Sequence, residues 1–207
     1  SVSFSEVERF ILTDGADTAT GSAGAETIDA GAGNDSISAG GGADLLLGGT
    51  GDDTIYDGAG ADTVYGGAGN DLIDDAGGFD STAEASLIYG EAGNDTIWGT
   101  AGGDTLDGGA DDDQLGGDSG NDLLLGGSGN DTLRGGAGND VLIGGAGADR
   151  IDGGTGVDTV DYSGSNAALT ITLAAPPLAT RPNGGHATGD NLLKVENVRG
   201  TAFNDTL

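Results

Sequence analysis

A repeat of nine residues constrains the fold of this chain more than any other feature of its sequence. Sixteen frames fit between Leu12 and Asp161 with one interruption. Position four is glycine except at Asp111, position six is aspartate except at Glu26, and position eight is always apolar. Columns this regular are typical of repeat proteins, in which each unit packs mainly on its neighbours.

Each frame divides into a turn and a short strand. Positions one to six carry the glycines, which allow the positive φ angles of a tight turn. Positions seven to nine, as in Thr54-Ile55-Tyr56, are rich in the β-branched and aromatic residues that favour strands. Alternation directs position eight to one face and positions seven and nine to the other. Stacked strands with one inward side chain each predict a β-solenoid with a narrow core.

The interruption falls within the frame that begins at Asp75. Residues 75–80 read as a turn that ends at Asp80, residues 81–86 break the period, and Leu87 resumes it. We interpret residues 81–86 as a loop inserted within one repeat. A linker between two domains would leave the half-frame on each side unexplained.

The charge balance limits the partners that the chain can have. There are 6 basic and 35 acidic residues, a formal net charge of −29, so nucleic acids and anionic membranes are repelled. The absence of cysteine excludes disulfides and thiolate metal sites, and no apolar run reaches transmembrane length. Such acidity can also mark a disordered chain, but the regular spacing favours a fold that multivalent cations neutralise.

The consensus GGxGxDxUx, repeated over residues 12–161, resembles the RTX nonapeptide of type I-secreted bacterial proteins. The resemblance implies an all-β fold, a right-handed parallel β-roll with two nonapeptides per coil, about eight coils and non-repeat end segments. It also implies Ca²⁺ as the cofactor, bound between turns of successive coils by position-six carboxylates and main-chain carbonyls. Oxygen ligands suit a hard cation such as Ca²⁺.

The resemblance assigns the metal ligands residue by residue. One column would be Asp17, Asp35, Asp53, Asp71, Asp95, Asp113, Asp131 and Asp149. The other would be Glu26, Asp44, Asp62, Asp80, Asp104, Asp122, Asp140 and Asp158. In the gap between Asp131 and Asp149, the family pattern implies carbonyl ligands at Gly127, Gly129, Gly144 and Ala146. Together the columns offer up to about 14 sites.

Two departures from the pattern affect individual sites. Glu26 is one methylene longer than aspartate, and Asp111 is not expected to take the backbone angles of the glycine it replaces. An alternative for all the aspartates is an Asx turn, in which the side chain caps its own backbone without metal. The crowding of like charges in stacked turns opposes that alternative.

The ends of the chain lie outside the regular repeat. We expect residues 1–11 to lead into the roll of residues 12–161, residues 162–199 to form capping strands and a loop, and residues 200–207 to begin a further repeat. Val7-Glu8 precedes Asp17 by the same interval that separates Val195-Glu196 from Asp205. This match favours blocks in tandem, although a lead-in used once more would read the same.

An apolar stripe is expected on one outer face of the roll. Its residues are Leu45, Leu47, Tyr65, Leu87, Tyr89, Leu123, Leu125, Val141 and Ile143. Such a stripe can bind another copy or a neighbouring domain, or be covered by the flanking segments of the same chain.

Catalytic motifs do not explain this sequence. Gly117-Asp118-Ser119-Gly120 resembles a serine-protease motif but falls on a repeat turn, and the single histidine, His186, lies in an irregular segment. We therefore expect no enzyme activity. The expected function is a calcium-binding structural module, secreted by bacteria and folded outside the cell, as one block of an adhesin, surface-layer or filament protein. The alternative is the secretion and folding domain of an exported protease, lipase or epimerase whose catalytic domain lies outside this chain.

Overall fold

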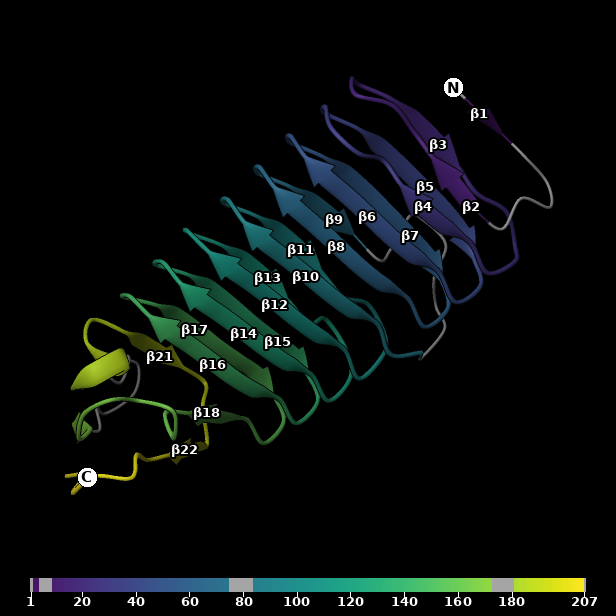
Figure 1. Cartoon of the computed structure of the whole chain (residues 1–207). Helices are drawn as coiled ribbons and strands as arrows, with labels where there is room; N and C mark the ends of the chain where they lie inside the picture. Colours follow the sequence, from purple (N-terminus) through teal and green to yellow (C-terminus); the bar gives the residue numbers. More distant parts are fainter. Residues whose placement is uncertain (1, 4–8, 75–83, 173–180, 207) are drawn as a thin grey trace.

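Two parallel sheets stacked face to face make up the solenoid, and the chain alternates between them (Figure 1). The computed structural model describes residues 2–3, 9–74, 84–172 and 181–206. The first sheet contains β1 (Val2–Ser3), β3 (Thr18–Thr20), β5 (Ser36–Gly41), β7 (Thr54–Ala59), β9 (Leu72–Asp74), β11 (Thr96–Trp98), β13 (Gln114–Gly116), β15 (Thr132–Ala137), β17 (Arg150–Thr155) and β21 (Asn191–Leu193). The second contains β2 (Arg9–Ile11), β4 (Thr27–Asp29), β6 (Leu45–Thr50), β8 (Thr63–Ala68), β10 (Leu87–Ala92), β12 (Thr105–Ala110), β14 (Leu123–Ser128), β16 (Val141–Ala146), β18 (Thr159–Asp161) and β22 (Asn197–Arg199).

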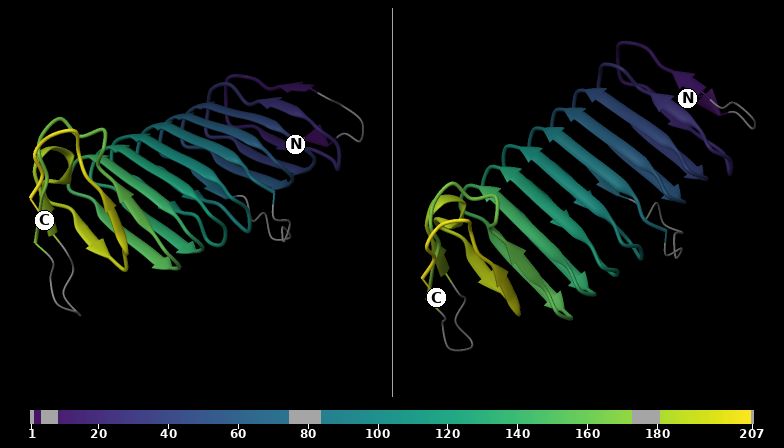
Figure 2. Two further views of the ribbon diagram at one scale, coloured as in Figure 1. Left: turned by 90° about the horizontal axis from the view of Figure 1, so that it is seen from below. Right: turned by 60° about the horizontal axis from the view of Figure 1, so that its bottom comes forward.

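Two nonapeptides form one coil. Strands that neighbour each other in a sheet are offset by two nonapeptides, as in the pairs Leu46↔Val64 and Leu124↔Leu142. The coils stack along a single axis, with the N-terminal strands at one end and the C-terminal strands at the other (Figure 2). The expected all-β parallel solenoid of about eight repeat coils is confirmed. In the described ranges the one helical element is a 3-10 turn at Gly185–Ala187, and none of them contains a helix able to cross a membrane.

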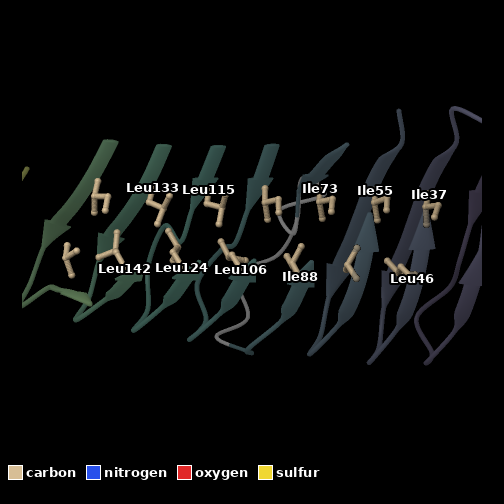
Figure 3. Packing of buried hydrophobic residues seen from close by; sticks show 14 of the residues in the cluster. Ile37, Leu46, Ile55, Ile73, Ile88, Leu106, Leu115, Leu124, Leu133 and Leu142 are labelled. Carbon is tan, nitrogen blue, oxygen red and sulfur yellow. The ribbon is translucent and has the colours of Figure 1, made fainter. Parts of the chain in front are cut away.

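The core is a double row of position-eight side chains. Every one is at most 1% exposed, and the rows from the two sheets face each other (Figure 3). These residues are Ala19, Ile28, Ile37, Leu46, Ile55, Val64, Ile73, Ile88, Ile97, Leu106, Leu115, Leu124, Leu133, Leu142, Ile151 and Val160. One buried aliphatic side chain per nonapeptide is a small core for so long an ordered chain. Packing alone therefore gives the fold little reserve.

The register survives the interruption of the repeat. β10 pairs with β8 at Leu87↔Thr63, and β11 pairs with β9 at Thr96↔Leu72, so the offset between neighbouring strands lengthens equally in both sheets. It returns to two nonapeptides in the next pair, where Leu87 lies opposite Thr105. Residues 75–83 lie outside the described part of the chain. The described residues 84–86 continue directly into β10.

The C-terminal segment leaves the solenoid after β18 and then returns to add a last strand to each sheet. β21 pairs with β17 and β22 with β18, both in parallel, so residues 191–199 add another strand to each sheet. Between them and β18 the chain forms an antiparallel pair, β19 (Thr170–Thr172) and β20 (Arg181–Asn183). Ala187, from the 3-10 turn, joins the buried core cluster.

The apolar stripe predicted from the sequence lies on the outer face of the second sheet. Its residues come from β6, β8, β10, β14 and β16. Leu45 and Leu87 are the most exposed, at 38% and 42%. The rings of Tyr65 and Tyr89 stack with centroids 5.0 Å apart. Asp107 of β12 pairs with both Tyr89 and Leu125 and interrupts the stripe.

Candidate calcium sites

Position-six carboxylates stack into two ladders, one on each side of the solenoid. The main-chain amide of Asp17 donates to Oδ1 of Asp35 at 2.7 Å, and the amide of Asp35 donates to Oδ1 of Asp53 at 2.8 Å. The same bond joins each successive pair of the first column as far as Asp149, at 2.8–3.0 Å. The second column repeats it from Glu26 to Asp62 and from Asp104 to Asp158. The structure thus brings together the side chains that the repeat placed in two columns.

The second carboxylate oxygen of most column residues is buried without a hydrogen-bond partner. This Oδ2 atom is buried and has no partner in eleven of them: Asp35, Asp44, Asp53, Asp71, Asp95, Asp113, Asp122, Asp131, Asp140, Asp149 and Asp158. None of these residues is more than 3% exposed. A buried, unpartnered carboxylate oxygen is costly. The same cost recurs at each of these eleven carboxylates, and a cation bound at each Oδ2 would offset it.

Main-chain carbonyls converge on the same points. A β-carbon added at Gly126 would lie against Oδ2 of Asp131 and 2.5 Å from the carbonyl oxygen of Gly144 in the next coil. Gly48 shows the same relation to Asp53 and Gly66. At these two position-one glycines a side chain would fill the space between a carboxylate and a carbonyl of adjacent coils.

The other implied carbonyl ligands lie in the same turns. Gly127 and Gly129 have φ angles of 105° and 148°, so both need the backbone freedom of glycine. The carbonyl of Ala146 accepts a hydrogen bond of 2.9 Å from the amide of Gly129, which leaves it one further lone pair.

Burial disfavours the ionised form of these carboxyl groups. It raises the pKa of Asp95, Asp113, Asp122 and Asp149 to about 7, and that of Asp44, Asp71 and Asp131 to about 6. The donated amide lowers each of these pKa values, and nearby carboxylates raise them. Ionised columns therefore require a compensating positive charge.

The donor set fits a hard divalent cation. Each gap offers carboxylate and carbonyl oxygens, which Ca²⁺ prefers, and the sequence has no cysteine for a softer metal. Within the described residues no three His, Cys, Asp or Glu side chains cluster as a metal centre. The main-chain carbonyls of the same turns are further oxygen donors at these places.

Three column members were missed by the sequence frame. Ser86 stands between Asp62 and Asp104: the amide of Asp62 donates to its Oγ at 3.3 Å, and its own amide donates to Oδ1 of Asp104 at 2.9 Å. The frame gave this place to Asp80, which lies outside the described residues, and counted residue 86 in the inserted loop.

The other two extend the columns beyond the repeat. Oδ1 of Asp190 accepts the amide of Asp149, and Oε2 of Glu196 accepts the amide of Asp158, both at 2.9 Å. Oδ2 of Asp190 is occupied, because the hydroxyl of Tyr162 donates to it at 2.6 Å. Gly184, Gly185 and Gly189 precede Asp190 but do not have the spacing of the repeat, and no glycine lies in the six residues before Glu196. The signal that could have found Asp190 is the apolar Leu192 two positions later, as in every repeat.

The structure also shows how the two departures from the repeat, Asp111 and Glu26, are accommodated. Asp111 adopts a φ of 81°, which is positive but outside the 120–151° range of the positive-φ glycines at position four, so it does not take their backbone angles. Glu26 keeps its place in the column, and both of its carboxylate oxygens accept hydrogen bonds from Ser22.

The two residues considered for catalysis, Ser119 and His186, make main-chain contacts within the fold. Ser119 forms parallel bridges to Ala101 and Ala137 of the adjacent coils. His186 lies in the 3-10 turn, where its amide donates to Oγ of Ser165.

Comparison with known proteins identifies the repeat. A sequence model of the RTX calcium-binding nonapeptide repeat, built from four copies, matches residues 11–46, 38–73, 47–81, 89–124 and 125–160. The one break between matched ranges falls at the interruption. No curated protein was found to match the chain.

Proposed function

The chain belongs to the RTX calcium-binding nonapeptide repeat family, and we propose that it is a structural module that folds around Ca²⁺ ions outside the bacterial cell. The observation that carries the proposal is the row of eleven buried Oδ2 atoms without hydrogen-bond partners. Bound calcium supplies the positive charge that compensates these buried carboxylates. The module has no catalytic role of its own in this proposal.

We assign each ion to a gap between stacked turns. Between Asp131 and Asp149, the Oδ2 atom of Asp131 and the carbonyl of Gly144 already converge. Carbonyls of Gly127, Gly129 and Ala146 complete the proposed ligand set. The same assignment applies to the other column aspartates whose Oδ2 is buried without a partner, and to the turn of Asp62.

Calcium dependence would suit export. At low calcium the stacked carboxylates repel one another, so the chain stays unfolded, as passage through a type I secretion channel requires. Outside the cell, calcium at the concentrations that extracellular modules bind, about 10⁻⁴–10⁻³ M, drives folding. We therefore propose that the folded module lies in the extracellular space or on the cell surface.

We further propose that the module is one block of a tandem array, as in an adhesin, surface-layer or filament protein. Two turns near opposite ends of the chain support this. Thr13 donates its amide and hydroxyl to Asp17, and Thr201 does the same to Asp205. The turn near the C-terminus thus repeats the first turn of the array in structure as well as in sequence. Further blocks in the parent sequence would support this role, and a catalytic domain beside it would indicate the secretion module of an exported enzyme.

Circular dichroism during a calcium titration tests the proposal. The purified chain in chelator is expected to be largely unfolded at neutral pH and to gain β structure as calcium rises into the millimolar range. Magnesium serves as the control ion, because it demands a smaller octahedral site. Full β structure in excess chelator would overturn the proposal.

A further inference from the structure

Position two of the nonapeptide divides the turns into two structural classes. In an open turn, the position-two residue has a positive φ and Oδ2 of the position-six aspartate has no partner. In a self-capped turn, position two is serine or threonine and donates hydrogen bonds to the position-six carboxylate. Fifteen turns fall into one class or the other: those of the eleven aspartates with an unpartnered Oδ2, and those of Asp17, Glu26, Asp104 and Asp205.

Eleven turns are open. Their position-two residues are Gly31, Gly40, Gly49, Gly67, Glu91, Gly109, Asp118, Gly127, Gly136, Gly145 and Gly154, and every one has a φ between 67° and 118°. Glu91 and Asp118 show that the backbone conformation, not the absence of a side chain, defines the class: their φ angles are 76° and 67°. The position-six carboxylates of these two turns, Asp95 and Asp122, keep an unpartnered Oδ2.

Four turns are self-capped. The amide and hydroxyl of Thr13 donate to Oδ2 of Asp17 at 3.0 and 2.6 Å, and Ser22 holds both oxygens of Glu26 at 3.1 and 2.5 Å. The amide of Thr100 donates to Oδ2 of Asp104 at 3.2 Å, and that of Thr201 donates to Oδ2 of Asp205 at 2.8 Å.

The cause lies in the side chain at position two. The described non-glycine residues with positive φ are Glu91, Asp111, Asp118 and Lys194, so none of the four capping residues is among them. A β-branched residue resists the left-handed region strongly, and serine hydroxyls favour local bonds to nearby polar groups. Outside that region the position-two N–H turns toward the carboxylate. The partly positive hydrogen of this N–H group then lies against the carboxylate oxygen that a cation would have to bind.

We infer that the residue at position two decides which turns of this chain hold calcium. Open turns bind an ion, and self-capped turns hold their carboxylate with their own amide and hydroxyl instead. This inference rests on the proposed function and narrows it: the turns of Asp17, Glu26 and Asp104 carry no ion on their Oδ2 side. The first coil is then independent of metal, and the second column is interrupted at Asp104.

Two stacked turns allow a matched test. Thr100 and Asp118 both occupy position two, in adjacent coils of the second column, where the amide of Ser119 donates to the carbonyl of Thr100. Thr100→Gly is expected to open its turn and add one ion, whereas Thr100→Ser keeps the cap and the wild-type number. Asp118→Thr is expected to close its turn and remove one ion. Asp118→Asn, which removes the same charge but tolerates positive φ, is expected to remove none.

Native mass spectrometry at saturating calcium resolves single bound ions, and circular dichroism checks that each variant is folded. Wild type that binds no calcium would overturn the proposed function itself. Wild type that binds many ions, with Thr100→Gly and Asp118→Thr binding the same number, would overturn the inference alone. If Asp118→Thr does not fold, the gain of an ion in Thr100→Gly still decides.

Discussion

The amide of Asp113 donates a hydrogen bond of 2.9 Å to Oδ1 of Asp131 in the next coil, while Oδ2 of Asp131 is buried without a partner. One carboxylate thus has two separate tasks. Oδ1 holds adjacent coils together through a bond that needs no metal. Oδ2 is left to the proposed ion.

The two tasks can be separated by mutation. Asp131→Asn keeps an acceptor for the Asp113 amide but removes the charge, so we expect the coils to stack only at higher calcium. Asp131→Ala also removes the acceptor and should lower the unfolding free energy in calcium by a further amount, about 1–3 kcal/mol. Calcium titrations followed by circular dichroism measure both effects.

The matched control is Asp112→Asn. Asp112 is exposed and accepts the amide of Asn130 at 2.6 Å, so its replacement removes one charge and keeps one acceptor outside the column. An equal rise in the calcium midpoint for Asp112→Asn and Asp131→Asn would mean that net charge, not the column, sets the affinity.

The position-one glycines make a steric prediction. Gly126→Ala places a methyl group between Oδ2 of Asp131 and the carbonyl of Gly144, where we expect it to weaken calcium binding in that gap. Overpacking of this kind destabilises a structure by about 1–3 kcal/mol. Gly164→Ala is the control, because an added β-carbon there meets nothing within 4 Å. Thermal unfolding in calcium should separate the two variants, and equal melting temperatures would contradict the assignment.

Most of the fold could be predicted from three columns of the repeat, because the nonapeptide period determines which side chains face inward and which carboxylates stack. The exceptions have one physical origin. Ser86, Asp190 and Glu196 enter the columns through hydrogen bonds between coils, which follow the spatial register rather than the spacing along the chain. Asp111 takes a positive φ at a position where the sequence favours glycine, so local preference yields to the stacking of its neighbours.

Acid should partly replace calcium. In the metal-free fold, burial raises the pKa of Asp95, Asp113 and Asp149 to about 7, against 3.8 for the same groups in an unfolded chain. The folded state therefore binds more protons than the unfolded state between these values. Its stability is greatest below about pH 4 and declines as the pH rises toward 7.

The measurement is circular dichroism of the chelator-treated chain between pH 8 and pH 4. We expect β structure to appear as the pH falls from about 7 toward 4, the interval in which the folded chain binds more protons than the unfolded chain. No gain of β structure above about pH 4 would instead indicate carboxyl groups of ordinary pKa and would contradict their burial.

At the end of the first column, the hydroxyl of Tyr162 donates to Oδ2 of Asp190, whereas the Oδ2 atoms from Asp35 to Asp149 have no partner. Tyr162 and Asp190 are both buried, and the 2.6 Å bond between them occupies the Oδ2 atom that stays free in Asp149. Burial raises the pKa of Asp190, so removal of its donor leaves a carboxyl group that is costly to ionise. Tyr162→Phe should therefore loosen β21 by about 1–3 kcal/mol without lowering the number of calcium ions bound.

Amide hydrogen exchange should show faster exchange in Asn191–Leu193 and unchanged exchange in β14. Uniform loss of protection along the solenoid would show that Tyr162 acts on the whole fold, and loss of a bound ion would show that Asp190 is a calcium ligand.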